Sequence, residues 1–359
     1  MLFRVPLVGG RLDFAQLAQL AAMAEGHGNG IIELTNRGNL QLRGVAESSV
    51  GVVVDALSMA GLGNEMARLV TISPMAGRRE HVARDGIVEA VADIDLDGLT
   101  GKFAVHVDDG AGCTGRHADV VVTCNSDGSV AIDLGSGVVE MSIASAGVAL
   151  RRVMTSCIEQ GPNARWKDVA GVAETRSLDI QSVEHASPVP GTASTTDGDA
   201  VLAGVTLGRT TPTQLRAVAR VATSHGLAAC SITPWRSILF ATPSSGPDRL
   251  ISDLEEIGLI TSVDHPAHGV IACVGGSGCW QTELDTLSAA GAVIAGRAQS
   301  WDATTPSPST SRSPSPTRSP VHVSGCAKSC ASQQPFTVLF LGRDDSSGFD
   351  MVVAQEVPA

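Results

Sequence analysis

The chain has 359 residues, of which 43% are hydrophobic, so it can bury a sizeable core and whole-chain disorder is excluded. Lysine and arginine total 25 against 37 aspartates and glutamates, and the net charge of −12 argues against nucleic-acid binding as the main activity. No apolar run reaches the roughly 18 residues of a transmembrane helix, and the first residues lack the apolar stretch of a signal peptide, so we expect a cytoplasmic protein with no membrane segment.

Two segments of the chain match each other without a gap. The first begins at Gly10 and the second at Gly208, an offset of 198 positions, and nine of 33 aligned residues are identical. Apolar positions such as Leu17 and Leu215 are also in register. Two unrelated alanine-rich helices would not share so many positions, so we interpret the pair as a duplicated module.

Each copy predicts the same order of elements, a ferredoxin-like half-domain of the split βαβ type. A strand precedes a helix that begins after a polar residue, and two further strands and a second helix follow. The named elements, first copy then second, are strands 3–8 and 202–207, helices 13–26 and 211–224, strands 31–34 and 229–232, and helices 50–60 and 247–257. We expect a pseudo-twofold axis between the copies and joined sheets, because each sheet alone would expose an edge strand.

The remaining segments predict two further α+β regions. The predicted elements there are strands 69–72, 103–107, 120–123, 130–134 and 270–273 and a helix at about 144–157. Residues 303–320 contain 15 Ser, Thr or Pro in 18 positions, which predicts a disordered loop. The expected domains are residues 1–75 (first repeat), 76–200 (α+β), 201–265 (second repeat) and 266–359 (cysteine-bearing).

Four of the eight cysteines form two close pairs, Cys273 with Cys279 and Cys326 with Cys330. Each pair follows a predicted strand in a loop rich in glycine and serine, whose backbone can curl and present amides to sulfur. Four thiolates in a reducing compartment suit a [4Fe–4S] cluster. Structural zinc, which usually takes closer pairs, and ordinary buried thiols are the alternatives. The unpaired cysteines are Cys113, Cys124, Cys157 and Cys230.

The cysteine spacing behind a duplicated half-domain resembles the sirohaem-type nitrite and sulfite reductase superfamily. Three short motifs carry the same resemblance: T-N-R-G-N-L-Q around Arg37, R-L-V-T-I-S-P from Arg68, and G-K-F around Lys102. The resemblance implies an α+β fold of paired half-domains with a [4Fe–4S] domain. It implies that Arg37, Arg68 and Lys102 are catalytic, and that Cys273, Cys279, Cys326 and Cys330 hold the cluster.

Within the superfamily, the chain is similar to the precorrin-3B synthases of aerobic cobalamin biosynthesis. The residues that carry this similarity are H-V-S-G-C-A-K-S-C from His322, and Ala104 in the place of a second lysine after Phe103. The resemblance implies a monooxygenase that hydroxylates precorrin-3A at C20 with O₂ and closes the ring A acetate into a γ-lactone. It implies a [4Fe–4S] cluster with a mononuclear non-haem iron in preference to sirohaem, and electrons from NADH through a reductase or from a ferredoxin.

Arginine suits this substrate, because precorrin-3A is fringed with carboxylates and the guanidinium fork binds carboxylates in a bidentate manner. Arg11 and Arg209 are further candidates for the pocket, whereas Arg236 lies one position beyond the equivalent of Arg37, where Trp235 stands. Two other functions stay open: a sirohaem-dependent sulfite or nitrite reductase, and a non-catalytic electron carrier with a cluster. Visible sirohaem bands would favour the first, and failure to turn over precorrin-3A in air would favour the second.

Overall fold

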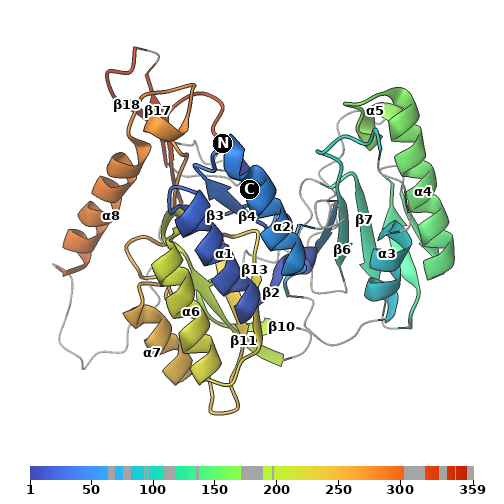
Figure 1. The fold of residues 1–359 in the computed structure, drawn as a ribbon, viewed down its shortest axis with the longest axis horizontal. Helices are drawn as coiled ribbons and strands as arrows, with labels where there is room; N and C mark the ends of the chain where they lie inside the picture. Colours follow the sequence, from blue (N-terminus) through green and yellow to red (C-terminus); the bar gives the residue numbers. More distant parts are fainter. Residues whose placement is uncertain are drawn as a thin grey trace.

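The structure is a computed structural model with two sheets in a central repeat region and one sheet in each of two flanking lobes (Figure 1). It describes residues 1–63, 69–75, 82–92, 94, 97–108, 118–125, 127–134, 137–170, 189–195, 198–302, 320–330, 338–343 and 345–353. Arg68 and the Ser/Pro-rich segment up to residue 319 lie outside the described residues.

The two repeats form the centre of the molecule and contain the predicted elements. The first comprises β1 (Leu2–Val5), β2 (Arg11–Asp13), α1 (Phe14–His27), β3 (Ile32–Leu34), β4 (Leu40–Arg43) and α2 (Val50–Met59). The second comprises β11 (Gly198–Gly204), β12 (Arg209–Thr210), α6 (Pro212–Ser224), β13 (Ala229–Ile232), β14 (Ser237–Ala241) and α7 (Asp248–Glu256), with β10 (Gly191–Thr195) added at its edge.

Both first helices begin at the polar residues that the sequence indicates. The Asp13 carboxylate accepts from the backbone N–H of Gln16 at 2.7 Å, and the Gln16 side chain accepts from the backbone N–H of Asp13 at 3.0 Å. In the second repeat the hydroxyl of Thr211 accepts from the backbone N–H of Gln214 at 3.2 Å. These bonds satisfy amides that would otherwise lack partners at each helix start.

The strand registers confirm the duplication. Arg4 lies opposite Gln41 in β1 and β4, and Leu202 lies opposite Leu239 in β11 and β14. Each residue of the second pair is 198 positions after its counterpart in the first, the same offset as in the sequence match. The remaining strand pairs of the two repeats keep this offset, so the copies share one backbone pattern.

The repeats are joined by a reciprocal exchange of short strands. β2 of the first repeat pairs with β13 of the second, and β12 of the second pairs with β3 of the first. The result is two sheets, ordered β1-β4-β3-β12 and β10-β11-β14-β13-β2, and not the single joined sheet that the sequence suggests. The exchange relates the copies by the predicted pseudo-twofold symmetry. Helices α1 and α6 pack against each other (Figure 1).

One hydrophobic core serves both repeats. Its fully buried side chains come from the facing helices and from the inner faces of both sheets, and include Leu17, Leu20, Leu215, Ile32 and Phe240. Because the core is shared, neither repeat buries its apolar face without the other.

The middle lobe contains the sheet β5-β6-β7-β8-β9 and its covering helices. Its elements are β5 (Val70–Ile72), α3 (Val82–Ala92), β6 (Val105–Asp108), β7 (Val120–Cys124), β8 (Val130–Asp133), β9 (Val138–Met141), α4 (Ile143–Gln160) and α5 (Trp166–Ala170). β5 pairs with β6 in this lobe, although it precedes the expected domain boundary at residue 76. β10 pairs with β11 in the second repeat, although it precedes the expected boundary at residue 201. The division of the chain at these two residues stays a prediction.

The cysteine-bearing lobe contains the sheet β15-β16-β17-β18 and helix α8. Its elements are β15 (Val270–Ala272), α8 (Thr286–Asp302), β16 (Val321–Ser324), β17 (Val338–Gly342) and β18 (Phe349–Val353). Within the described residues, no helix combines the length and hydropathy needed to cross a bilayer.

We expect Gly10→Ala to destabilise the junction between the repeats. Gly10 has φ of +70°, and a Cβ atom there would lie 2.1 Å from the backbone oxygen of Ile232. Gly30 is the matched control, because its φ is +76° and a Cβ atom would have no neighbour within 4 Å. Urea unfolding should show a loss of about 1 kcal/mol for Gly30→Ala and about 3 kcal/mol or more for Gly10→Ala. Equal losses would contradict the close junction.

Candidate functional site

The two cysteine loops leave the same edge of one sheet. β15 and β16 are parallel neighbours, with Ala272 opposite Val323. Cys273 follows β15 directly, and Cys326 comes two residues after the end of β16. Because the carboxyl ends of parallel strands lie at one edge, the pairing brings together loops that are more than 40 residues apart in sequence.

Backbone amides point at the sulfurs of this site. The N–H of Gly325 donates to Sγ of Cys273 at 3.2 Å, and the N–H of Gln281 donates to Sγ of Cys279 at 3.4 Å. The first bond joins one cysteine loop to the other. Amide bonds of this kind favour the thiolate form and tune cluster potentials in iron–sulfur proteins.

Glycines allow each cysteine loop to pack closely against neighbouring chain. Gly275 has φ of +50°, and a Cβ atom there would lie 2.4 Å from Oγ1 of Thr286. A Cβ atom at Gly325 would lie 2.4 Å from Cγ2 of Thr282, so neither position accepts a side chain without movement. The loops also touch at their rims, where Nζ of Lys328 lies 5.1 Å from the centroid of the Trp280 ring.

Cys330 lies within electrostatic reach of the other three loop cysteines. Partial burial raises the pKa of the Cys330 thiol, and the thiolates of Cys326, Cys273 and Cys279 raise it further, while Lys328 lowers it. A thiolate cluster of this kind is self-repelling until cations neutralise it. The convergence of all four sulfurs on one centre stays a prediction.

The assignment of a [4Fe–4S] cluster to Cys273, Cys279, Cys326 and Cys330 stays a prediction. Among the residues that the structure describes, no three His, Cys, Asp or Glu side chains are placed to hold one metal ion. Cys157 differs from the loop cysteines, because burial raises its pKa to about 11 and keeps it a neutral core thiol. The mononuclear iron stays a prediction.

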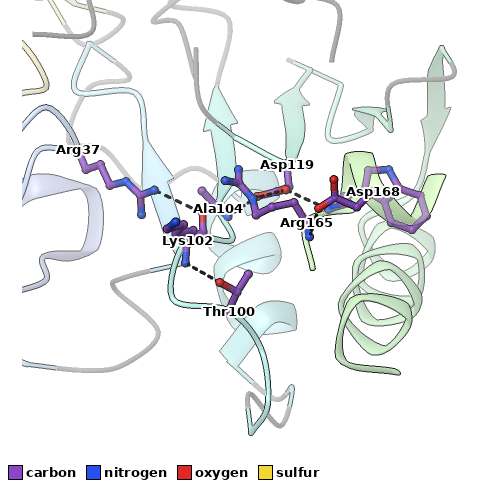
Figure 2. Close-up of polar contacts among 8 residues, drawn as sticks. Arg37, Thr100, Lys102, Ala104, Asp119, Arg165 and Asp168 are labelled. Carbon is purple, nitrogen blue, oxygen red and sulfur yellow. Dashed lines mark hydrogen bonds and ion pairs between the residues drawn. The ribbon is translucent and has the colours of Figure 1, made fainter. Parts of the chain in front are cut away.

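Arg37 lies on a turn that is held by hydrogen bonds from other residues of its own sequence motif. The hydroxyl of Thr35 accepts from the backbone N–H groups of Arg37 at 3.3 Å and Asn39 at 3.1 Å, and the side chain of Asn39 accepts from the N–H of Leu7 at 2.8 Å. The half-buried guanidinium donates from Nη2 to the backbone oxygen of Lys102 at 3.4 Å (Figure 2). The fold thus brings together two predicted residues that are 65 positions apart.

Arg37 lies near two other arginines and one carboxylate. Burial lowers the pKa of the Arg37 guanidinium, Arg165 and Arg4 lower it further, and Asp119 opposes them. Lys102 is exposed beside this group, with its backbone N–H 3.4 Å from Oγ1 of Thr100. Positive charges that repel one another in a partly buried site are favourable only toward an anion.

Asp119 organises this region, although the sequence did not single it out. Its carboxylate accepts from Nε of Arg165 at 2.7 and 2.9 Å, from the N–H of Ala104 at 3.0 Å and from the N–H of Trp166 at 3.1 Å (Figure 2). Its side chain is only 2% exposed. Asp119 therefore holds the chain just after Lys102 and holds Arg165 near Arg37. Its partners are as many as 47 positions away, so the local sequence carried no signal of this role.

The other sequence candidates have different outcomes. Arg68 lies outside the described residues, so its role stays a prediction. Arg11 is exposed on the exchanged strand β2. Arg209 and Arg236 lie close to Glu33 on the far side of the repeats from α1 and α6.

The fold resembles that of known proteins. The family described as nitrite/sulfite reductase ferredoxin-like half domain matches residues 1–60 and 194–246, which cover most of both repeats. The NirA protein of Mycobacterium tuberculosis has the same fold, with a TM-score of 0.70 and 19% identity over 98% of this chain and 73% of that chain. The predicted fold class and superfamily resemblance are thereby confirmed.

A particular enzyme is similar along almost the whole chain. A precorrin-3B synthase from Sinorhizobium sp is 25% identical over 98% of this chain and 79% of that protein. This match confirms the resemblance inferred from the cysteine and lysine motifs. Together the relatives support an enzyme of the oxidoreductase class, and their fold is consistent with an iron–sulfur cluster.

We expect Asp119→Ala to destabilise the middle lobe strongly. Removing the carboxylate leaves Arg165 and two backbone N–H groups without their buried acceptor. Unfolding in urea should show a loss of about 3–5 kcal/mol. Asp168→Ala is the control, because it removes an exposed carboxylate that accepts from the N–H of Arg165 at 2.9 Å, and should cost about 1 kcal/mol. Similar losses for both variants would contradict this account of Asp119.

Proposed function

We propose that the protein is a precorrin-3B synthase-like monooxygenase that acts on precorrin-3A with O₂. One oxygen atom enters the substrate as the C20 hydroxyl group, and the other leaves as water with two electrons and two protons from a donor. The ring A acetate closes into a γ-lactone. The electrons come from NADH through a reductase or from a ferredoxin. The observation that carries the proposal is the cationic group around Arg37, in a chain similar to a precorrin-3B synthase.

The cysteine loops supply the redox centre in this proposal. Cys273, Cys279, Cys326 and Cys330 would hold a [4Fe–4S] cluster, which supplies single electrons when it is bound. The chain contributes amide bonds to sulfur from Gly325 and Gln281. The parallel strands β15 and β16 keep the two loops together.

Arg37 and Lys102 bind and orient the substrate carboxylates. The turn of Thr35 and Asn39 fixes the backbone of Arg37, and Asp119 fixes the segment that carries Lys102. Half-buried cations bind carboxylates more strongly than exposed ones, because water competes less for the charge. Arg68 is proposed to line the same site on the strength of its motif alone.

Replacing a ligand cysteine should remove the cluster. Cys326→Ala is expected to lose the brown absorption and the bound iron and sulfide, because one of four thiolate ligands is gone. Cys157→Ala is the control, since this neutral thiol is buried in α4 and should retain iron. Iron and sulfide counts after anaerobic purification show whether each variant retains the cluster. Full iron content in Cys326→Ala would contradict the ligand assignment, and sirohaem bands in the unaltered protein would favour a reductase.

Replacing Arg37 should weaken substrate binding and leave the cluster intact. A charge-assisted bond is worth about 1.5–3 kcal/mol, so Arg37→Ala should weaken precorrin-3A binding about ten- to a hundredfold. Iron content should be unchanged, because no cysteine is altered. Arg249→Ala, an exposed arginine in α7, is the control. Unaltered affinity in Arg37→Ala would end the proposal that Arg37 binds a carboxylate.

A further inference from the structure

Cys273 is the most buried of the four loop cysteines, and hydrogen bonds engage both its backbone and its sulfur. Its N–H donates to the backbone oxygen of Val323 at 3.0 Å, and its Sγ accepts from the N–H of Gly325 at 3.2 Å. Its carbonyl oxygen accepts from the hydroxyl of Thr286 at 2.7 Å. Cys273 is 8% exposed, whereas the other three loop cysteines are half-buried or exposed. The structure therefore fixes this cysteine from three sides.

The bond to the carbonyl comes from a side chain that is itself completely buried. Thr286 is the first residue of α8, and its exposed fraction is 0%. A buried hydroxyl group is favourable only when it is hydrogen-bonded, because it has lost its contacts with water. Thr286 meets this requirement by donating to Cys273, which is 13 positions earlier in the sequence. The bond thus ties a cysteine loop to a helix.

The start of α8 does not itself need the Thr286 hydroxyl. The carboxylate of Asp285 accepts from the backbone N–H of Ser288 at 3.0 Å and from the hydroxyl of Ser288 at 2.6 Å. This is the usual cap of a helix N-terminus, in which a side chain satisfies the amide three residues later. Because Asp285 caps the helix, the hydroxyl of Thr286 serves the loop of Cys273 instead.

The loop of Cys273 is shaped to fit against the first turn of α8. Gly275 lies against Thr286, since a Cβ atom at Gly275 would be 2.4 Å from Oγ1 of Thr286 and 2.6 Å from the backbone oxygen of Leu284. The N–H of Gly276 donates to the same oxygen of Leu284 at 2.7 Å. Close packing and hydrogen bonding therefore act together at this contact, and the hydroxyl of Thr286 lies at its centre.

The contact also has an electrostatic consequence. The O–H group of Thr286 directs its positive end at the peptide group of Cys273. The N-terminus of a helix carries a partial positive charge, and α8 is 17 residues long. Reduction of an iron–sulfur cluster adds one negative charge to the iron, sulfide and thiolate atoms. Positive ends of dipoles beside one ligand favour the reduced form, and so raise the reduction potential.

We propose that Thr286 is a positioning residue for the iron–sulfur centre. Its hydroxyl holds the Cys273 loop against α8, which raises the reduction potential of the cluster and slows the loss of its iron. The proposal rests on the proposed function, because it assumes a cluster on the four loop cysteines. Thr286 is not a ligand, and it acts on the cluster through Cys273.

The test removes the hydroxyl and keeps the shape of the side chain. In Thr286→Val a methyl group replaces the hydroxyl, so the carbonyl of Cys273 loses its donor. The reduction potential of the anaerobically purified protein, titrated and followed by the electron paramagnetic resonance of the reduced cluster, should fall. A chelator should remove iron about tenfold faster, which corresponds to about 1.4 kcal/mol. A loss of this size is expected for a buried hydrogen bond whose acceptor is left without a donor.

Two further variants separate positioning from a general loss of stability. Thr286→Ser keeps the hydroxyl, so its potential and its rate of iron loss should stay close to those of the unaltered protein. Thr210→Val is the matched control, because Thr210 is also buried and donates to Oε1 of Gln214 at 2.9 Å in the second repeat. It should lower the urea midpoint and leave the potential unchanged. An equal shift in potential for Thr286→Ser and Thr286→Val would overturn the proposal.

The remaining outcomes distinguish this proposal from the proposed function. If Cys326→Ala loses its iron but Thr286→Val matches the unaltered protein in potential and iron loss, the role of Thr286 is overturned and the ligand assignment stands. If Cys326→Ala keeps its full iron content, both proposals fail. If Thr286→Val assembles no cluster while Thr286→Ser and Thr210→Val do, the positioning role is supported. Failure of Thr210→Val to assemble a cluster as well would overturn that role.

Discussion

Strands β3 and β13 each need a hydrogen-bonding partner at an edge that their own repeat leaves open, and each receives it from the other repeat. This constraint relates the two copies by a twofold axis and commits their helices to one shared core. It also determines which sheet faces remain outward. The Arg37 turn, Arg43 and Arg209 all lie on the sheet that β12 completes. The geometry of the candidate site therefore depends on two or three residues of exchanged strand.

Much of this fold could be predicted from the sequence, because the two copies have apolar residues at equivalent buried positions. Leu17 and Leu215 recur at a fixed offset since both pack into the same core. The two cysteine pairs were readable because each follows an apolar strand. The exchanged strands were not predicted, because three residues and two residues are too short to show a period of alternation. The joined sheet expected from the pattern became two sheets for the same reason.

The charged residues of the site were much harder to predict from the sequence. Arg37 stood in a motif, but Asp119 acts through partners 15 to 47 positions away, which only the folded chain brings near. Arg236 was discounted because Trp235 occupies the position equivalent to Arg37. The fold gives Arg236 a different neighbour, Glu33 of the other repeat, through the contact of β12 with β3. Charge pairs between the repeats leave no local pattern in the sequence, whereas buried apolar residues recur there at regular spacing.

The two repeats carry different side chains at equivalent positions on the outer faces of their sheets, such as Arg4 in the first and Leu202 in the second, which has a consequence for how such a chain arises. A single half-domain that made the same strand exchange with a second copy of itself would form a homodimer with two identical outer faces. Any change that made one face cationic would make the other cationic too. Covalent fusion of the two copies removes this coupling, so one face can become the apolar cluster of Leu202 and Leu239 while the other gathers arginines. Fusion thus allows a protein with a nearly symmetric backbone to bind an asymmetric substrate.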